Sequence, residues 1–160
     1  MADVSLPIDP APSPRLPHAG NPLSLNPTRP TALPTGDDVT MYERLGGHET
    51  FVQLVHRFYQ GVARDPTLRA MYPEEDLGPA ERRLRMFLEQ YWGGPHTYHE
   101  ERGHPRLRMR HMPFAVTPAM RDRWLAHMRE ALDSLELDSD LRGPLWEYLE
   151  SAANFMVNTP

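Results

Sequence analysis

The chain has 160 residues, 39% of them hydrophobic and 24% charged, which is typical of one globular domain of ordinary size. Its net charge of −5 argues against a general nucleic-acid-binding protein, and no apolar run reaches the length of a membrane helix. Cysteine is absent, which excludes disulfides, thiolate metal sites and cysteine nucleophiles.

The first 40 residues differ in composition from the rest of the chain. They contain nine of the 18 prolines, no aromatic residue and no helical apolar pattern. Such a segment buries too little surface to offset its conformational entropy, so we expect a disordered Pro-rich tail over residues 1–40 and a folded domain over residues 41–160. The N-terminus lacks the basic start and apolar stretch of a secretory signal, which leads us to expect a cytoplasmic protein.

After residue 40 the apolar pattern is helical. Over residues 48–63 apolar side chains recur at steps of three and four, which predicts one buried helix face, and Asp65-Pro66 follows as a break. Pro79 begins a second predicted helix, because a missing N–H costs nothing in the first turn. Gly93-Gly94-Pro95 ends this helix.

The second half of the chain predicts two further helices. Residues 95–113 read as irregular, apart from one or two helical turns at residues 107–111. Thr117-Pro118 is an N-cap followed by proline, which begins a third long helix, and a last helix begins near Asp140. Strand-like alternation is weak throughout, so we predict an all-α fold.

The predicted core contains aromatic residues with polar tips. These residues are Tyr59, Tyr72, Tyr91, Trp92 and Trp124. Buried tyrosine and tryptophan normally need a hydrogen-bond partner for the O–H or N–H group. Periodicity leaves two interpretations open: the tips reach water at the boundary of the core, or several of them converge on one cavity lined by donors.

Four runs between about residue 41 and residue 158 form a recognisable set: MYERLGGHETF, RFYQGVARDPTLRAMYPEEDLGPAERRLRMFLEQYWGGPHTY, RGHPRLRMRHMPF and RDRWLAHM. Through these runs the chain resembles a group II truncated haemoglobin. The resemblance implies a truncated globin, a two-over-two helical sandwich that encloses haem b (iron protoporphyrin IX). It also implies that His111 is the proximal iron ligand, and that the small residue Ala80 leaves the distal side open.

The resemblance assigns further residues to the haem pocket. Tyr59, Tyr72 and Trp124 would face the bound ligand, with Tyr72 and Trp124 also in contact with the haem. The apolar wall above the haem would include Leu84, Phe87 and Leu88. Arg83 and Arg110 are candidates for the haem propionates, because guanidinium binds carboxylates through two parallel hydrogen bonds; the alternative is that both are ordinary surface arginines.

A zinc or non-haem metal site is the competing interpretation of the histidines. It would use His96, His99, His104 and His111. Their spacings of three, five and seven residues fall on a proline-interrupted segment without the short fixed spacing and carboxylate support of metal sites. We therefore favour the haem interpretation.

The implied function is binding of dioxygen, and of other diatomic ligands such as NO and CO, at a five-coordinate haem iron. Two distal donors would slow oxygen release, which suits storage, sensing or redox chemistry better than delivery. The alternative is an enzyme, either peroxidase-like or oxidising nitric oxide to nitrate, which would need an unidentified reductase. A homodimer is compatible with the sequence.

A third hypothesis belongs to a different class of protein. It is a cofactor-free helical module that works through the Pro-rich tail as a recognition segment. The tail has no repeated PxxP pattern with flanking basic residues, so we do not favour this hypothesis.

Overall fold

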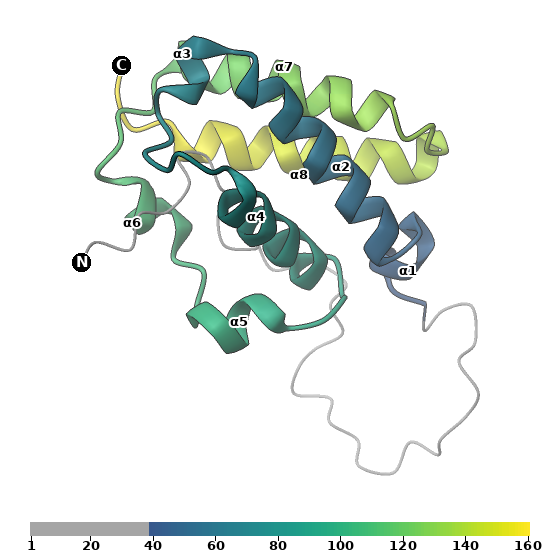
Figure 1. Cartoon of the computed structure of the whole chain (residues 1–160). Coiled ribbons are helices and arrows are strands. Elements are labelled where there is room, and N and C mark those ends of the chain that lie inside the picture. The colour runs from purple at the N-terminus through teal and green to yellow at the C-terminus, as the bar shows by residue number, and fades with distance from the viewer. Residues whose placement is uncertain (1–38) are drawn as a thin grey trace.

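Figure 1 shows the computed structural model, which describes residues 39–160. Within this range the chain forms helices and no strand, so the all-α prediction is confirmed. The helices are α1 (Met41–Leu45), α2 (His48–Ala63), α3 (Pro66–Arg69), α4 (Gly78–Tyr91), α5 (Thr97–Arg102), α6 (Leu107–His111), α7 (Pro118–Asp133) and α8 (Ser139–Met156). The predicted Pro-rich tail lies almost wholly outside the described residues. Within them, no helix combines the length and apolar character that crossing a bilayer requires.

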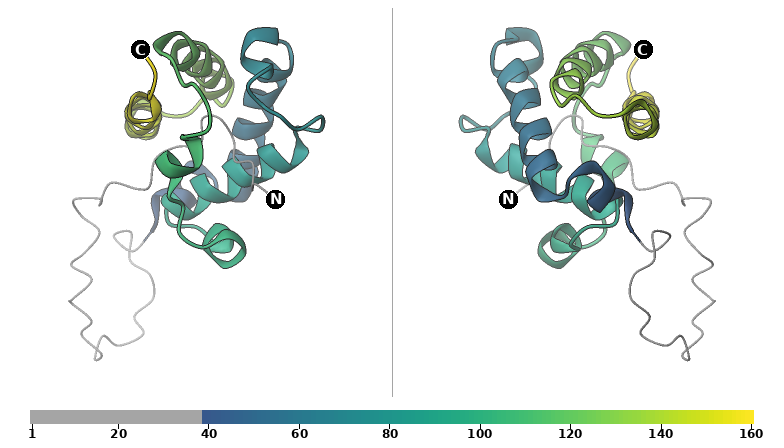
Figure 2. Two further views of the ribbon diagram at one scale, coloured as in Figure 1. Left: turned by 90° about the vertical axis from the view of Figure 1, so that its left-hand side faces the viewer. Right: turned by 90° about the vertical axis from the view of Figure 1, so that its right-hand side faces the viewer.

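The four long helices form two pairs. Helix α2 packs against α4, and α7 packs against α8. The pairs are joined mainly where α2 crosses α7, so that the chain forms two layers of two helices each (Figure 1). Figure 2 views the α7–α8 pair nearly end-on, with α2 in the other layer. This is the predicted two-over-two arrangement.

The predicted helix faces are the buried ones. Helix α2 spans the predicted range, and its apolar stripe from Phe51 to Val62 is buried. Helix α7 begins at the predicted N-cap, where the Thr117 hydroxyl accepts a hydrogen bond from the Met120 N–H at 3.2 Å. Its stripe is buried at Trp124, and Met120 at its start is half-buried. Amphipathic periodicity therefore determined which faces make the core.

Three short helices were not predicted. Helices α1 and α3 depend on caps: the Thr40 hydroxyl accepts from Glu43 N–H, and the Asp65 carboxylate accepts from Leu68 N–H. Helix α5 lies in the segment predicted to be irregular and buries only Tyr98. Helices of four to six residues carry too few apolar positions to show a period, which explains why the pattern missed them.

The crossing of α2 and α7 is close because residue 61 has no side chain. A Cβ atom added to Gly61 would lie 2.6 Å from His127 Nδ1. No real Cβ atom approaches a neighbour so closely, so glycine is what allows the two layers to meet here.

Asp65 joins the same two helices through a buried polar cluster. Its carboxylate accepts hydrogen bonds from His127 Nε2 at 2.9 Å, from Leu68 N–H at 3.2 Å and from Arg123 Nη1 at 3.1 Å. Burial alone would raise the pKa of Asp65, but these hydrogen bonds outweigh it and lower the pKa to about 2. The carboxylate is therefore charged and fully engaged at neutral pH.

Replacing Asp65 by Asn should lower the free energy of unfolding by about 2 kcal/mol at pH 7, because it removes the buried charge that accepts hydrogen bonds from Leu68, Arg123 and His127. The pKa of the folded carboxylate is depressed, so its stabilisation is present above about pH 4 and is lost as the pH falls towards 2. Urea unfolding at several pH values measures both effects. Asp122→Asn, an exposed carboxylate on α7, is the matched control. An equal loss for the two variants would contradict the assignment.

Candidate functional site

His111 is the last residue of the five-residue helix α6, and its side chain is completely buried. Its Nδ1–H donates a hydrogen bond to the carbonyl oxygen of Leu107, one turn earlier on the same helix, at 2.5 Å. Because Nδ1 carries the proton, Nε2 is the nitrogen with the lone pair. Burial lowers the pKa of His111 to about 4, against the smaller opposing effect of the Leu107 hydrogen bond. A neutral imidazole with its second nitrogen hydrogen-bonded to a carbonyl is the usual form of a metal-binding histidine.

The C-terminal segment holds the end of α6 in place. Asn158 Nδ2 donates to the carbonyl oxygens of His111 at 3.2 Å and Phe114 at 2.9 Å. Its Oδ1 accepts the N–H of Val116 at 2.9 Å. Sequence reasoning missed Asn158, because a single polar residue near a chain end carries no pattern that links it to residue 111.

Three predicted distal residues come together from three elements. Tyr59 lies on α2, Tyr72 follows α3 and Trp124 lies on α7, and all three side chains are buried. The rings of Tyr59 and Tyr72 meet edge to face at 5.8 Å between centroids. Phe58 bridges Tyr59 and Trp124, with centroid distances of 5.0 and 5.1 Å. Of the two interpretations left open for these tips, exposure to water is excluded for Tyr59, Tyr72 and Trp124 by their burial.

The indole N–H of Trp124 has no acceptor among residues 39–160, although the side chain is only 1% exposed. A buried donor without an acceptor costs about 1–3 kcal/mol, so native proteins rarely leave one. An acceptor supplied by a bound molecule would remove that cost. The Trp124 N–H thus fits a site that receives a ligand with a hydrogen-bond acceptor.

The predicted apolar wall is buried on α4. Ala80, Leu84, Phe87 and Leu88 belong to one hydrophobic core together with Tyr59 and the other aromatic residues. The ring of Phe87 contacts Tyr98 at 5.6 Å and Tyr91 at 6.3 Å. Phe87 therefore connects the predicted wall to a second aromatic group near α5.

The two predicted propionate arginines are anchored within the chain. Arg83, whose side chain is 11% exposed, pairs with Glu74 at 2.6 Å. Arg110 donates from Nε to the Pro105 carbonyl at 2.9 Å and from Nη2 to the Arg102 carbonyl at 3.1 Å. Both side chains are thus held in defined positions, and neither is an ordinary solvated arginine.

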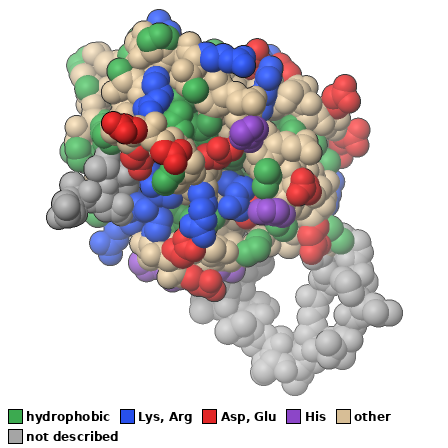
Figure 3. Space-filling model, viewed as in Figure 1, with side chains coloured by type: hydrophobic (Ala, Val, Ile, Leu, Met, Phe, Trp, Pro, Cys, Tyr) green, Lys and Arg blue, Asp and Glu red, His purple; other side chains and the backbone are tan. Residues whose placement is uncertain are grey.

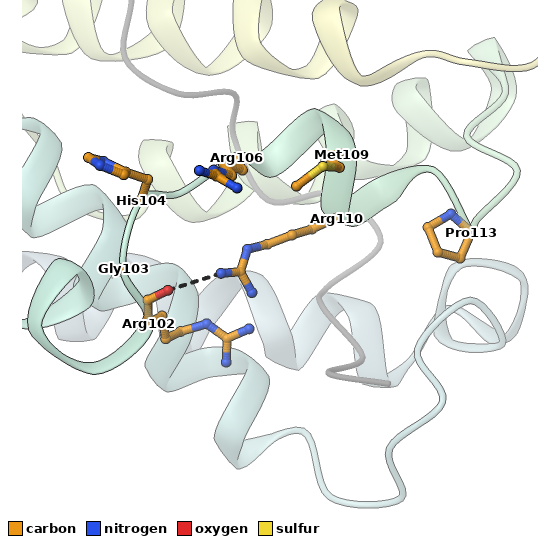
Figure 4. A pocket seen from close by; sticks show the side chains of 7 residues that line it. All are labelled: Arg102, Gly103, His104, Arg106, Met109, Arg110 and Pro113. Atoms are coloured by element: carbon orange, nitrogen blue, oxygen red, sulfur yellow. Dashed lines mark hydrogen bonds between the residues drawn. The ribbon is translucent and has the colours of Figure 1, made fainter. Parts of the chain in front are cut away.

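Arg83 and Arg110 line two neighbouring pockets. Arg110 borders a pocket of about 550 Å³ beside α6, and Arg83 borders one of about 420 Å³ beside α4. Arg102 lines both pockets, and Figure 4 shows its guanidinium on the same side of the first pocket as that of Arg110. Sequence reasoning missed Arg102; its only signal was its place in an arginine-rich stretch.

The competing histidine site does not assemble in the described part of the chain. The rings of His99 and His104 lie 5.1 Å apart, whereas His111 is buried with its Nδ1 on Leu107. Residues 39–160 contain no group of three or more His, Cys, Asp or Glu side chains that could hold a metal ion.

Comparison with known proteins identifies relatives over the described domain. The family model described as "Bacterial-like globin" matches residues 40–158. The Group 2 truncated hemoglobin YjbI of Bacillus subtilis is 44% identical over 117 residues, which cover 73% of this chain and 87% of that protein.

Solved structures give the same result. A thermostable hemoglobin from the actinobacterium Thermobifida fusca is 65% identical, with a TM-score of 0.75, and the match covers 76% of this chain and 99% of that one. A truncated oxygen-avid haemoglobin from Bacillus subtilis is 43% identical, with a TM-score of 0.71, covering 75% of this chain and all of that one.

Proposed function

The chain belongs to the bacterial-like globin family, among the group II truncated haemoglobins, and is a haem-binding globin; on this basis we propose that it binds dioxygen at a haem b with tight distal hydrogen bonding. The related haemoglobin of Bacillus subtilis is described as oxygen-avid. The observation that carries the proposal is the buried indole N–H of Trp124, which lacks an acceptor among the described residues.

The residues present fit a haem. His111 would hold the iron through Nε2, because Nδ1 is committed to the Leu107 carbonyl. Arg110 and Arg83 would bind the propionates, for which a fixed guanidinium is suited. When bound, the haem would supply an iron that can bind a diatomic gas.

The distal residues then determine which gas is retained. Trp124, Tyr59 and Tyr72 offer an indole N–H and two hydroxyls within one buried group of rings. Dioxygen accepts stronger hydrogen bonds than carbon monoxide, so these donors favour its retention. Ala80, small and buried on α4, leaves room on the ligand side. Leu84, Phe87 and Leu88 exclude water, which strengthens each hydrogen bond that forms.

A redox enzyme is the second candidate, and one observation favours it. The Tyr91 and Tyr148 rings stack at 3.8 Å, and Tyr91 also contacts Phe87 of the predicted wall at 6.3 Å. This row of aromatics offers oxidisable side chains between the pocket and the surface. The reaction would be oxidation of nitric oxide, NO + O₂ + e⁻ → NO₃⁻, or one-electron oxidation of donors by peroxide.

Turnover separates the two candidates. The protein is supplied with nitric oxide and dioxygen, or with peroxide and a phenol, in the presence of excess reductant. Sustained turnover would establish the enzyme, and Tyr91→Phe should then reduce the rate of the phenol reaction at least tenfold. Reversible oxygenation without turnover would support oxygen binding as the sole function.

Replacing His111 by Gly should weaken haem binding by more than about 100-fold, because the iron loses its protein ligand. The haem should separate during gel filtration and the Soret band should be lost. Imidazole added at millimolar concentration should restore both, since it fits the space that the side chain leaves. His104→Gly, an exposed histidine, is the control. Full haem retention by His111→Gly without imidazole would contradict the assignment.

Replacing Trp124 by Phe should raise the dioxygen dissociation rate about tenfold, the equivalent of one charge-assisted hydrogen bond. The carbon monoxide dissociation rate should change less than about threefold. Stopped-flow ligand replacement measures both rates. Equal acceleration for the two gases would mean that Trp124 controls access and donates no hydrogen bond.

A further inference from the structure

An exposed face of the molecule combines apolar and basic side chains around helix α6. Its members, called the α6 face below, are Arg106, Arg108, Met109, Met112 and Phe155. Met109, Met112 and Phe155 are 59%, 64% and 49% exposed, and among residues 39–160 the one other exposed large hydrophobic residue is Val39, at 37%. Exposed apolar residues gathered in one place mark an interaction surface.

Arg108 and Phe155 of the α6 face are in direct contact. The Arg108 guanidinium lies 4.9 Å from the centre of the Phe155 ring and donates to the Phe155 carbonyl at 2.6 Å. Met109 lies on α6 and Met112 directly follows it, and the pockets that they line share Pro113. Figure 4 shows Arg106 and Met109 together along one rim of the larger pocket, with the Arg110 side chain extending below them.

The charge of this region is opposite to that of the whole chain. From Arg102 to Arg121 the sequence contains five arginines and no Asp or Glu, although the chain carries a net charge of −5. Within the described part of the chain, neither Arg106 nor Arg108 has a carboxylate within ion-pair distance. Figure 3 shows arginine side chains gathered over the α4–α6 region. An acidic partner would be repelled by the remaining surface and drawn to this region.

The residue types also fit a protein partner. Protein interfaces are enriched in Arg, Met and aromatic residues and depleted in Lys. The α6 face consists of arginine, methionine and phenylalanine alone, and the whole sequence contains no lysine. Unbranched methionine side chains adapt to different partner surfaces.

Arg108 and Met109 of the α6 face lie on the same helix as the proposed iron ligand. Leu107 and His111 are buried on the inner side of α6, whereas Met109 and Met112 are exposed. A protein seated on the outer side would be separated from His111 by about the width of one helix, roughly 10 Å. This position suits electron delivery to the iron better than ligand exchange, which uses the opposite side of the haem.

We propose that the α6 face is the docking surface for a small acidic electron-transfer protein, a reduced flavin or iron–sulfur carrier. The inference rests on the proposed function, since dioxygen binding requires ferrous iron. In each event the carrier is oxidised by one electron, and ferric iron is reduced to ferrous. Electron-transfer complexes of this kind are small and transient, in keeping with a face made of one short helix and the end of another.

The test uses the full-length ferric haem protein and reduced flavodoxin, a small acidic flavoprotein, as the probe. Stopped-flow spectroscopy gives the second-order rate constant of haem reduction at 20 and 500 mM salt. The double variant Arg106→Glu/Arg108→Glu should lower this constant by about tenfold or more at low salt, and the difference should disappear at high salt. Calorimetric titration with oxidised flavodoxin should show the same loss of affinity without any reaction.

Arg57→Glu/Arg64→Glu is the matched control, because both arginines are exposed on or beside α2 and make no ion pair among the described residues. It should stay within about twofold of the parent protein. Met109→Ser/Met112→Ser should weaken flavodoxin binding while preserving its salt dependence, since it removes apolar contact and no charge.

Four outcomes overturn the inference. The first two are that the parent protein does not bind flavodoxin, and that the two charge-reversed variants have equal effects. The third is that the parent protein binds vesicles of anionic lipid and the Arg106→Glu/Arg108→Glu variant does not. The fourth is that the parent protein sediments as a dimer and Met112→Glu dissociates it. The last two would assign the face to a membrane or to a second copy of the chain. Haem content and the spectrum of the dithionite-reduced, oxygenated protein test the proposed function separately. If the chain binds no haem, the proposed function is wrong. If the protein is oxygenated normally but flavodoxin reduces the Arg106→Glu/Arg108→Glu variant at the parent rate, only the inference about the α6 face is wrong.

Discussion

The hydrogen bond from His111 Nδ1 to the Leu107 carbonyl determines the chemistry of the site. Because donor and acceptor lie on the same helical turn, α6 itself contributes to the orientation of the ring. A helix of five residues is too short to be stable alone, so it must be held from outside. Asn158 does this by bonding the carbonyls of His111 and Phe114, so the C-terminal segment holds the proposed iron ligand in place.

The opposite wall of the site shows a second constraint, that of polar groups inside an apolar core. Tyr59, Tyr72 and Trp124 are almost completely buried, yet they carry three hydrogen-bonding groups. At position 124 a phenylalanine would pack with no polar atom to satisfy, so the sequence retains an N–H donor where folding alone favours none. A core residue that costs stability is expected where the protein binds a ligand. This argument points to Trp124 from its own burial and its N–H group, without comparison with any relative.

The long helices could be predicted from the sequence because their apolar residues are periodic. Features without such a period could not be predicted in this way. Long amphipathic helices repeat the apolar pattern over several turns, so the sequence predicts the start of α2 and of α7 almost to the residue. Helices α3 and α5 depend on one cap or one buried ring and leave no periodic trace. Composition alone left the polar aromatics with two interpretations, and it took the fold to bring Tyr59 and Trp124 to the same bridging ring, Phe58. Contacts of high sequence separation, such as Asn158 with His111, lie beyond any local pattern.

The glycine at the crossing of α2 and α7 has a consequence for the pocket as well as for the packing. Tyr59 precedes Gly61 by two residues, and Trp124 precedes His127 by three, so both rings proposed to face the ligand lie within one turn of that crossing. The distance between the phenol and the indole therefore depends on how closely the two helix backbones approach. A methyl group at residue 61 would push α2 and α7 apart and so alter the proposed distal pocket from a position outside it.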